Sequence, residues 1–505
     1  MSGRLRFGYG TNGLADHRLD DALAFLAESG YQGVALTLDH HHLDPFAPDL
    51  TARVEHVVRR LADLGLAVVV ETGARFLLDA RAKHQPTLLS DEADGRARRL
   101  DYLTRAVRVG AGLGAEAVSF WSGTPSPGCP PDEAWRRLVD GCARLMEEAT
   151  RAGVTVGFEP EPGMLVDRID GYERLAAALG HPAGFGLTLD VGHCRCNEDD
   201  DAEACIRRVG AHLVNVQIED MRRSVHEHLD FGEGEIDFPA VLGALAEVGY
   251  AGLVSVELPR DSHRAHEVVP RSLRFLRTAE MVSAVAADPA AVRTRFPAAA
   301  RVAGRAPVPG PEAAGGLLFT LTQDDAARIA LLDALGERVG EELADLYRHG
   351  DAAERRAVLR WLGRRPDGPP PPGVPAIELI EDALRSSDPR LLAAALGPWA
   401  MRHLDDPTLA QAVLKCVFVG VPLAGLAGLR ARAGPELARM LAGYVHERVA
   451  AGRDVPVDVW PLIDAYPPEA ELAAIEAELG HPVAERRRAA ATALAGRTRA
   501  GTASG

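Results

Sequence analysis

The sequence is poor in cysteine and has no long apolar run. Six of its 505 residues are cysteine, and their spacing fits neither a disulfide framework nor a zinc-binding CxxC pattern. No segment approaches the roughly 20 apolar residues that a membrane-spanning helix needs. The N-terminus enters a predicted strand without the apolar region of a signal peptide. We therefore expect a cytoplasmic protein with reduced thiols and no membrane span.

Positive charge is also scarce. The chain has 56 Lys and Arg residues against 72 Asp and Glu residues, which leaves a formal net charge of −16. A protein that binds duplex nucleic acid needs a basic face to displace counterions, so nucleic acid is excluded as the main partner. An anionic membrane surface is disfavoured for the same reason. The length and the 47% hydrophobic content allow more than one domain with an ordinary core.

Short apolar segments alternate with amphipathic helical stretches over the first 277 residues. Eight segments have the length and composition of strands, at residues 6–10, 34–38, 68–71, 117–120, 154–158, 186–189, 213–216 and 253–256. Eight such units match a closed (β/α)₈ (TIM) barrel. An open doubly wound sheet is the alternative, but the sequence after the first strand lacks the GxGxxG spacing of its phosphate loop. The fold class predicted for residues 1–278 is therefore α/β, as a TIM barrel.

Four consecutive strands end in a side chain that offers oxygen to a metal. Glu159 follows strand five, Asp190 strand six, Gln217 strand seven and Glu257 strand eight. Active sites of such barrels lie at these strand ends, and converging buried carboxylates repel one another unless a cation lies between them. The pattern predicts a divalent metal site, with Mg²⁺, Mn²⁺ or Co²⁺ favoured by oxygen ligands and Zn²⁺ if histidine joins. The alternative is that each acid caps a helix or pairs with arginine.

Three histidines follow these strand ends. His193 lies three residues after Asp190, so it points toward the same end of the barrel as a substrate contact or a second-site ligand. His226 and His228 are separated by one residue in a predicted extended loop, where alternate side chains face the same way and would share a second metal. A solvated loop is the alternative reading of this pair.

These residues resemble the xylose isomerase-like superfamily, which includes sugar isomerases, ketose 3-epimerases, inosose-processing enzymes and endonuclease IV-type nucleases. The resemblance covers about residues 4–277. It implies metal ligation by Glu159, Asp190 and Glu257, proton transfer next to a carbonyl by Glu159 and Glu257, and substrate contact by His193. Glu161 and Trp121, which lie at the same strand ends, are candidates for further substrate contacts.

One position departs from the resembled pattern. The epimerases carry histidine where this chain has Gln217, and a neutral amide oxygen is a weaker ligand for transition metals than imidazole. His226 and His228 occupy the positions of an Asp-x-His pair that binds an additional zinc ion in the nucleases of this superfamily. The earlier nuclease histidines are replaced by Glu71 and Trp121, which together with the negative charge disfavours a nuclease.

The composition changes near residue 278. Residues 279–316 are rich in Ala, Pro and Gly and are expected to form an extended linker. Helical periodicity follows over residues 317–470 and predicts a separate all-α domain, and residues 471–505 are expected to form a terminal helix and a disordered tail. The helical part resembles the EboA-like family of bacterial metabolite traffic, through WLGRR (361–365), LKCVFVGVPL (414–423), RARAGPELARM (430–440) and HER (446–448).

Two functions follow from these features. The first is a metal-dependent isomerase or epimerase that acts on a small sugar-like polyol or cyclitol. The second is a non-catalytic metabolite-binding or trafficking component with a degenerate metal site, which Gln217 and the helical domain favour. Partner proteins of a metabolite-traffic system are expected in either case.

Overall fold

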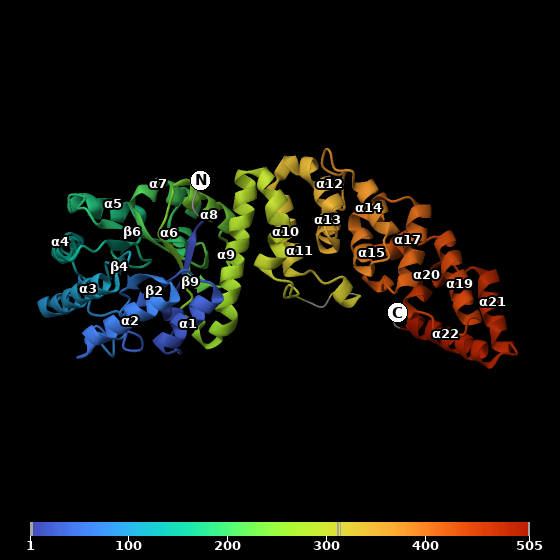
Figure 1. Cartoon of the computed structure of the whole chain (residues 1–505), viewed down its shortest axis with the longest axis horizontal. Helices are drawn as coiled ribbons and strands as arrows, with labels where there is room; N and C mark the ends of the chain where they lie inside the picture. The colour runs from blue at the N-terminus through green and yellow to red at the C-terminus, as the bar shows by residue number, and fades with distance from the viewer. Residues whose placement is uncertain (1–3, 311–312, 314, 503–505) are drawn as a thin grey trace. The chain divides into compact units, whose positions relative to one another are not determined.

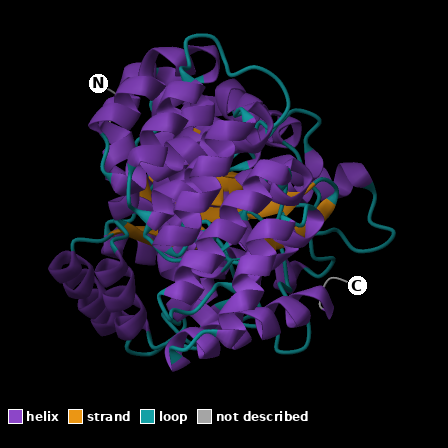
Figure 2. Cartoon of the chain, turned by 90° about the vertical axis from the view of Figure 1, so that its right-hand side faces the viewer, coloured by secondary structure: helices purple, strands orange, loops and turns teal. Residues whose placement is uncertain are grey.

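The computed structural model describes residues 4–310, 313 and 315–502. Its chain divides into two compact units, Met1–Ser283 and Ala284–Gly505. The first unit contains every strand that the structure assigns, and the second is built from helices (Figure 1). In Figure 2 the strands, drawn in orange, lie together in a single group. Within the described residues, no helix is both long and apolar enough to cross a membrane.

The first unit is a closed barrel of eight parallel strands. The strands follow the chain order from β1 to β7, and β10 lies between β7 and β1 and closes the barrel. Their bounds are β1 Arg6–Gly10, β2 Gly33–Thr37, β3 Ala67–Glu71, β4 Val118–Trp121, β5 Val156–Glu159, β6 Phe185–Asp190, β7 Leu213–Ile218 and β10 Leu253–Val256. The strands are almost entirely buried, as expected when helices cover a parallel sheet. The predicted barrel is thus confirmed.

Helices connect the strands and place all their carboxyl ends on one side. They are α1 Leu19–Ser29, α2 Leu50–Leu64, α3 Ala93–Leu113, α4 Pro131–Ala152, α5 Ile169–Ala178, α6 Val191–Asn197, α7 Ala202–Val209, α8 Phe238–Glu247 and α9 Ala265–Ala287. Gly30 and Gly153 end α1 and α4 in the left-handed conformation, at φ +94° and +68°. Glycine adopts this conformation without strain, so each helix stops where the next strand must begin.

The segment after β7 is a β-hairpin and not the expected extended loop. Its antiparallel strands are β8 Asp220–Arg222 and β9 Val225–Leu229. The Asp220 carboxylate accepts hydrogen bonds from the backbone N–H groups of Gly232, Gly234 and Ile236, at 2.8–3.2 Å. These bonds fold the glycine-rich segment back against β8.

The expected extended linker is wrong for much of its length. Helix α9 continues to Ala287, and α10 covers Val292–Ala303. Alanine is the strongest helix former, and the Phe296 ring of α10 is fully buried, with Arg328 of the next helix reaching its carbonyl. Helix propensity together with this burial outweighs the proline content on which the linker prediction depended.

The second unit is all helical, as expected. Its longer helices after α10 are α11 Gln323–Ala334, α12 Val339–His349, α13 Ala352–Gly363, α14 Ala376–Arg385, α15 Pro389–Ala395, α16 Pro398–His403, α17 Asp406–Val419, α19 Pro435–Ala450, α20 Trp460–Ala465, α21 Glu469–Ala477 and α22 Ala484–Thr502. Helix α22 occupies most of the predicted terminal tail. The last tail residues, 503–505, lie outside the described residues.

Candidate metal centre at the carboxyl ends of the strands

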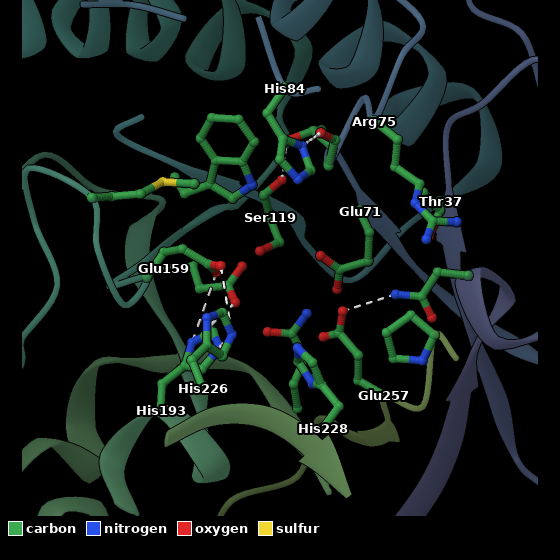
Figure 3. A pocket seen from close by; sticks show the side chains of 18 of the residues that line it. Thr37, Glu71, Arg75, His84, Ser119, Glu159, His193, His226, His228 and Glu257 are labelled. Carbon is green, nitrogen blue, oxygen red and sulfur yellow. Dashed lines mark hydrogen bonds and ion pairs between the residues drawn. The ribbon is translucent and has the colours of Figure 1, made fainter. Parts of the chain in front are cut away.

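The carboxyl ends of the barrel strands surround a polar cavity of about 310 Å³. This volume lies at the lower end of the roughly 300–1,000 Å³ typical of small-molecule sites. Eight of the residues predicted from the sequence line it: Trp121, Glu159, Glu161, His193, Gln217, His226, His228 and Glu257. Figure 3 shows Glu71, Glu159 and Glu257 pointing toward one another across the cavity, with His193, His226 and His228 on one side.

Three carboxylates converge on one point. Glu159, Asp190 and Glu257 offer oxygens that all lie within 4.8 Å of one another. Burial raises the pKa of Glu159 well above its usual value, and the neighbouring carboxylates, Glu161 first, raise it further. Burial likewise raises the pKa of Glu257, whose Oε1 accepts a hydrogen bond from Asn12 Nδ2 at 2.8 Å. Charges held this close need a cation or protons to compensate them.

Asp190 connects this cluster to the following helix. It precedes α6, and its Oδ1 accepts the backbone N–H of His193 at 2.8 Å, so one carboxylate caps the helix and orients the histidine. Burial raises its pKa, but the nearby His193 and His228 imidazoles outweigh that effect and keep the pKa below its usual value. Among the described residues, its Oδ2 has no hydrogen-bond partner.

Gln217 lies beside Asp190 on the neighbouring strand. Its side chain is buried, and its Oε1 is without a hydrogen-bond partner within the described part of the chain. A buried carbonyl oxygen in that state costs free energy unless something binds it. The free oxygens of Asp190 and Gln217, next to Glu159 and Glu257, therefore fit a divalent cation held mainly by oxygen.

The three histidines lie together but take different partners. His193 Nδ1 donates to the Pro160 carbonyl at 3.2 Å, and its Nε2 lies 3.2 Å from Nε2 of His226. Burial lowers the pKa of His193 to about 4, so its ring is neutral at pH 7 and its Nε2 accepts the His226 proton. His228, on the same strand as His226, instead places Nδ1 3.6 Å from Glu219 Oε1.

The two remaining predicted residues also lie at the cavity. Burial, followed by the charge of Glu257, raises the pKa of Glu161 to about 8. The buried Arg99 guanidinium stacks over the Trp121 ring, 4.1 Å from the ring centroid, and this cation–π contact fixes the position of the ring.

Sequence reasoning did not include several residues of the cavity. Glu71 ends β3 after an apolar run, which is the same signal as at Glu159, and its Oε1 accepts a hydrogen bond from Asn215 Nδ2 at 3.0 Å. Burial and the charge of Glu257 raise its pKa to about 8. Arg75 and Lys83 reach the cavity from the loop after β3 and add positive charge. Nothing in the local sequence indicates that an arginine or lysine in this loop reaches the cavity.

Comparison with known proteins agrees with this geometry. The family model described as "Xylose isomerase-like TIM barrel" matches residues 23–279, and that of "Metabolite traffic protein EboA" matches residues 379–464. The L-ribulose-5-phosphate 3-epimerase UlaE of Escherichia coli is 28% identical over 191 residues. That match covers 38% of this chain and 66% of the relative, so the chain spans slightly less than two thirds of the relative's length.

Solved structures of two sugar epimerases align with part of the chain. The 3-keto-D-glucoside 4-epimerase YcjR from E. coli is 18% identical with a TM-score of 0.45, over 55% of this chain and 100% of that one. An L-ribulose 3-epimerase is 20% identical with a TM-score of 0.45, over 57% and 98% of the two chains. The family model covers more than half of the chain. The chain therefore belongs to the xylose isomerase-like TIM barrel family, and residues 379–464 of its helical unit are similar to the EboA family.

Proposed function

We propose that the barrel is a metal-dependent isomerase or epimerase that transfers a proton next to the carbonyl of a sugar or cyclitol. The observation that carries this proposal is the convergence of Glu159, Asp190 and Glu257 within 4.8 Å at the carboxyl ends of three strands. Distant homology to sugar 3-epimerases supports the reaction class. Glu159, Asp190, Gln217 and Glu257 would hold Mn²⁺, Mg²⁺, Co²⁺ or Zn²⁺, which when bound polarises the substrate carbonyl as a Lewis acid.

Glu159 and Glu257 are the proposed catalytic residues. Glu159 ends β5 and Glu257 directly follows β10. In the barrel β6 and β7 lie between these two strands, so the two carboxylates approach a bound carbon from different directions. One takes the α-proton, and the electron pair left on carbon moves into the carbonyl to give an enediolate. The second carboxylate returns a proton to the same carbon from the opposite face, which inverts that centre. If the proton is instead delivered to the former carbonyl carbon, and the hydroxyl proton passes between the two oxygens, the carbonyl moves by one carbon.

Other residues of the cavity would bind the substrate. His193 and Glu161 offer polar contacts to hydroxyl groups, and the Trp121 ring offers a flat face to the C–H side of a sugar. His226 and His228 are the pair predicted from the sequence as second-metal ligands, and their nitrogens lie within 4.8 Å of one another and of a His193 nitrogen.

Exchange of substrate hydrogen in deuterated water tests the proposal. The metal-loaded protein should incorporate deuterium at the carbon next to the carbonyl of a substrate within a panel of ketoses, ketose phosphates and inososes. Glu159→Gln and Glu257→Gln should each abolish this incorporation. Glu116→Gln is the matched control, because Glu116 pairs with Arg6, which begins β1 at the other end of the barrel, and should retain it. Exchange that survives both catalytic substitutions refutes the assigned roles.

A second candidate is a metabolite-binding or trafficking component without catalysis. The match of residues 379–464 to a metabolite traffic family favours it, as does Gln217 in place of the histidine of the epimerases. A folded protein that holds no metal and exchanges no hydrogen across the panel would support this candidate.

A further inference from the structure

Glu219 is a fully buried carboxylate beside the cavity. It follows β7, and its side chain is fully buried at 0% exposure. Neither of its oxygens accepts a hydrogen bond from an N–H or O–H donor among the residues that the structure describes. The Asp190 carboxylate lies beside it, and the two can share a hydrogen bond only when a proton lies between the two acids. A carboxylate in this state costs several kcal/mol unless a cation or a proton compensates it.

The fold leaves room for this side chain at a specific place. A Cβ atom at Gly192 would lie 2.0 Å from Glu219 Oε1 and 2.7 Å from the Met221 methyl group. Any larger residue at position 192 would therefore displace the Glu219 carboxylate. The absence of a side chain at Gly192, at the start of α6, leaves space for the Glu219 carboxylate beside Asp190. Two acids this close to each other are unfavourable unless a cation or a proton compensates their charges.

Two more unpartnered atoms face Glu219. Asp190 Oδ2 and His228 Nδ1 are buried and make no hydrogen bond within the described ranges. One ligand atom from each of Asp190, Glu219 and His228 lies within 4.8 Å of the others. Two carboxylates and an imidazole are a typical ligand set for Mn²⁺, Co²⁺ or Zn²⁺.

The hydrogen bonds of the three histidines distinguish His228 from His193 and His226. His193 and His226 bond to each other, and His193 also bonds to a backbone carbonyl. His228 keeps its Nδ1 free and directs it toward Glu219. Of the two histidines on β9, His228 is therefore the one whose nitrogen is available beside buried carboxylates.

The charge balance also calls for a further cation. Glu159, Asp190, Glu219 and Glu257 carry four negative charges when all of them are ionised, and one divalent cation balances only two; the others need protons or a second cation. In the described part of the chain, the one ion-pair contact of Glu219 is with His228, and no Lys or Arg reaches its carboxylate.

We propose that Asp190, Glu219 and His228 form a second divalent-cation site beside the one at Glu159 and Glu257, with Asp190 as the shared ligand. This inference rests on the proposed function for the first site only. The second site would take Mn²⁺, Co²⁺ or Zn²⁺. Pairs of metal ions in enzymes commonly lie about 3.5–4 Å apart.

Elemental analysis of the full chain after dialysis against Mn²⁺ tests this site. The parent protein should hold two Mn²⁺ ions per chain, and Glu219→Gln and His228→Ala should each hold one. Glu71→Gln, the matched change of a buried cavity carboxylate that already has a partner in Asn215, should still hold two. The electron paramagnetic resonance spectrum gives a second readout, because the exchange coupling of a Mn²⁺ pair should be present in the parent and lost in both site variants.

Two outcomes overturn the inference. One is a parent protein that holds fewer than two ions, and the other is an unchanged metal content in Glu219→Gln and His228→Ala. The His228→Ala change lies on the partly exposed hairpin strand, so it keeps the test valid if Glu219→Gln does not fold. Deuterium exchange, which Glu257→Gln should abolish, is measured in a separate experiment. The second metal site and the proposed reaction can therefore be refuted independently of each other.

Discussion

Replacing Glu219 by glutamine should stabilise the metal-free protein. The parent side chain is fully buried, and no described residue makes a hydrogen bond to either oxygen. Burial, followed by the charge of Asp190, raises the pKa of Glu219 well above its usual value, so the metal-free parent must take up a proton on folding at pH 7. A glutamine amide of the same shape is already neutral and avoids that cost. A buried unsatisfied polar group costs about 1–3 kcal/mol, so we expect a gain of about 2 kcal/mol. For a unit of this size that raises Tm by roughly 4–8 °C.

Metal should reverse the order of the two proteins. A ligand that binds only the folded state stabilises it by about 2.7 kcal/mol at a concentration of 100 Kd. The parent gains this from both sites, whereas Glu219→Gln gains it from one. The assay is thermal unfolding of the barrel transition in chelator and in excess Mn²⁺, with the parent less stable in the first condition and more stable in the second.

The control and the refutation use the same assay. Glu71→Gln changes a buried carboxylate whose Oε1 already accepts a hydrogen bond from Asn215, so it should respond to Mn²⁺ as the parent does. A lower Tm of Glu219→Gln in chelator would show that the carboxylate makes a stabilising interaction in the metal-free state. The reasoning from its unpartnered oxygens would then be wrong.

Three further predictions concern single residues. Gln217→His should tighten Zn²⁺ and Co²⁺ binding about 10- to 100-fold, or about 1.4–2.8 kcal/mol, with no gain for Mg²⁺; equal changes for all three metals in equilibrium titrations would contradict the ligand role. Gly192→Ala should cost about 1–3 kcal/mol by overpacking and lower the Mn²⁺ content from two to one, because its Cβ would meet Glu219 Oε1. In the helical unit, Asp324 pairs with Arg328 at 2.6 Å, with both side chains almost fully buried. Asp324→Asn should therefore cost about 3–5 kcal/mol at pH 7 in urea unfolding. Burial raises the pKa of Asp324, but Thr322 and Arg328 outweigh it and lower the pKa below its usual value. The pair thus stabilises the unit above the unfolded-state pKa of about 3.9, and this stability is lost as the pH falls through the lowered pKa. A cost that stays constant down to that pH would contradict this origin.

Local patterns in the chain were enough to predict the barrel. The segments that form β1 and β10 were predicted at their exact bounds, and the other barrel strands were predicted within two residues at either end. Buried parallel strands need short β-branched runs between helices, and such runs can be located from the sequence. The same logic placed Glu159, Asp190 and Glu257 near one another, since a parallel barrel brings all the carboxyl ends of its strands together. Residues 292–303 were misjudged because composition does not include the burial of Phe296.

The sequence by itself therefore determined the fold class and the strand ends that carry the acids. Only the tertiary structure decided which of those groups are paired. Glu219 and Asp220 are neighbours in the chain, yet Asp220 accepts several backbone N–H groups, whereas Glu219 accepts none from the described residues. His226 and His228 lie on one strand, yet one bonds to another imidazole and the other faces a carboxylate. Such partners come from segments far apart in sequence, so their distances are set by how the elements pack and not by any local pattern.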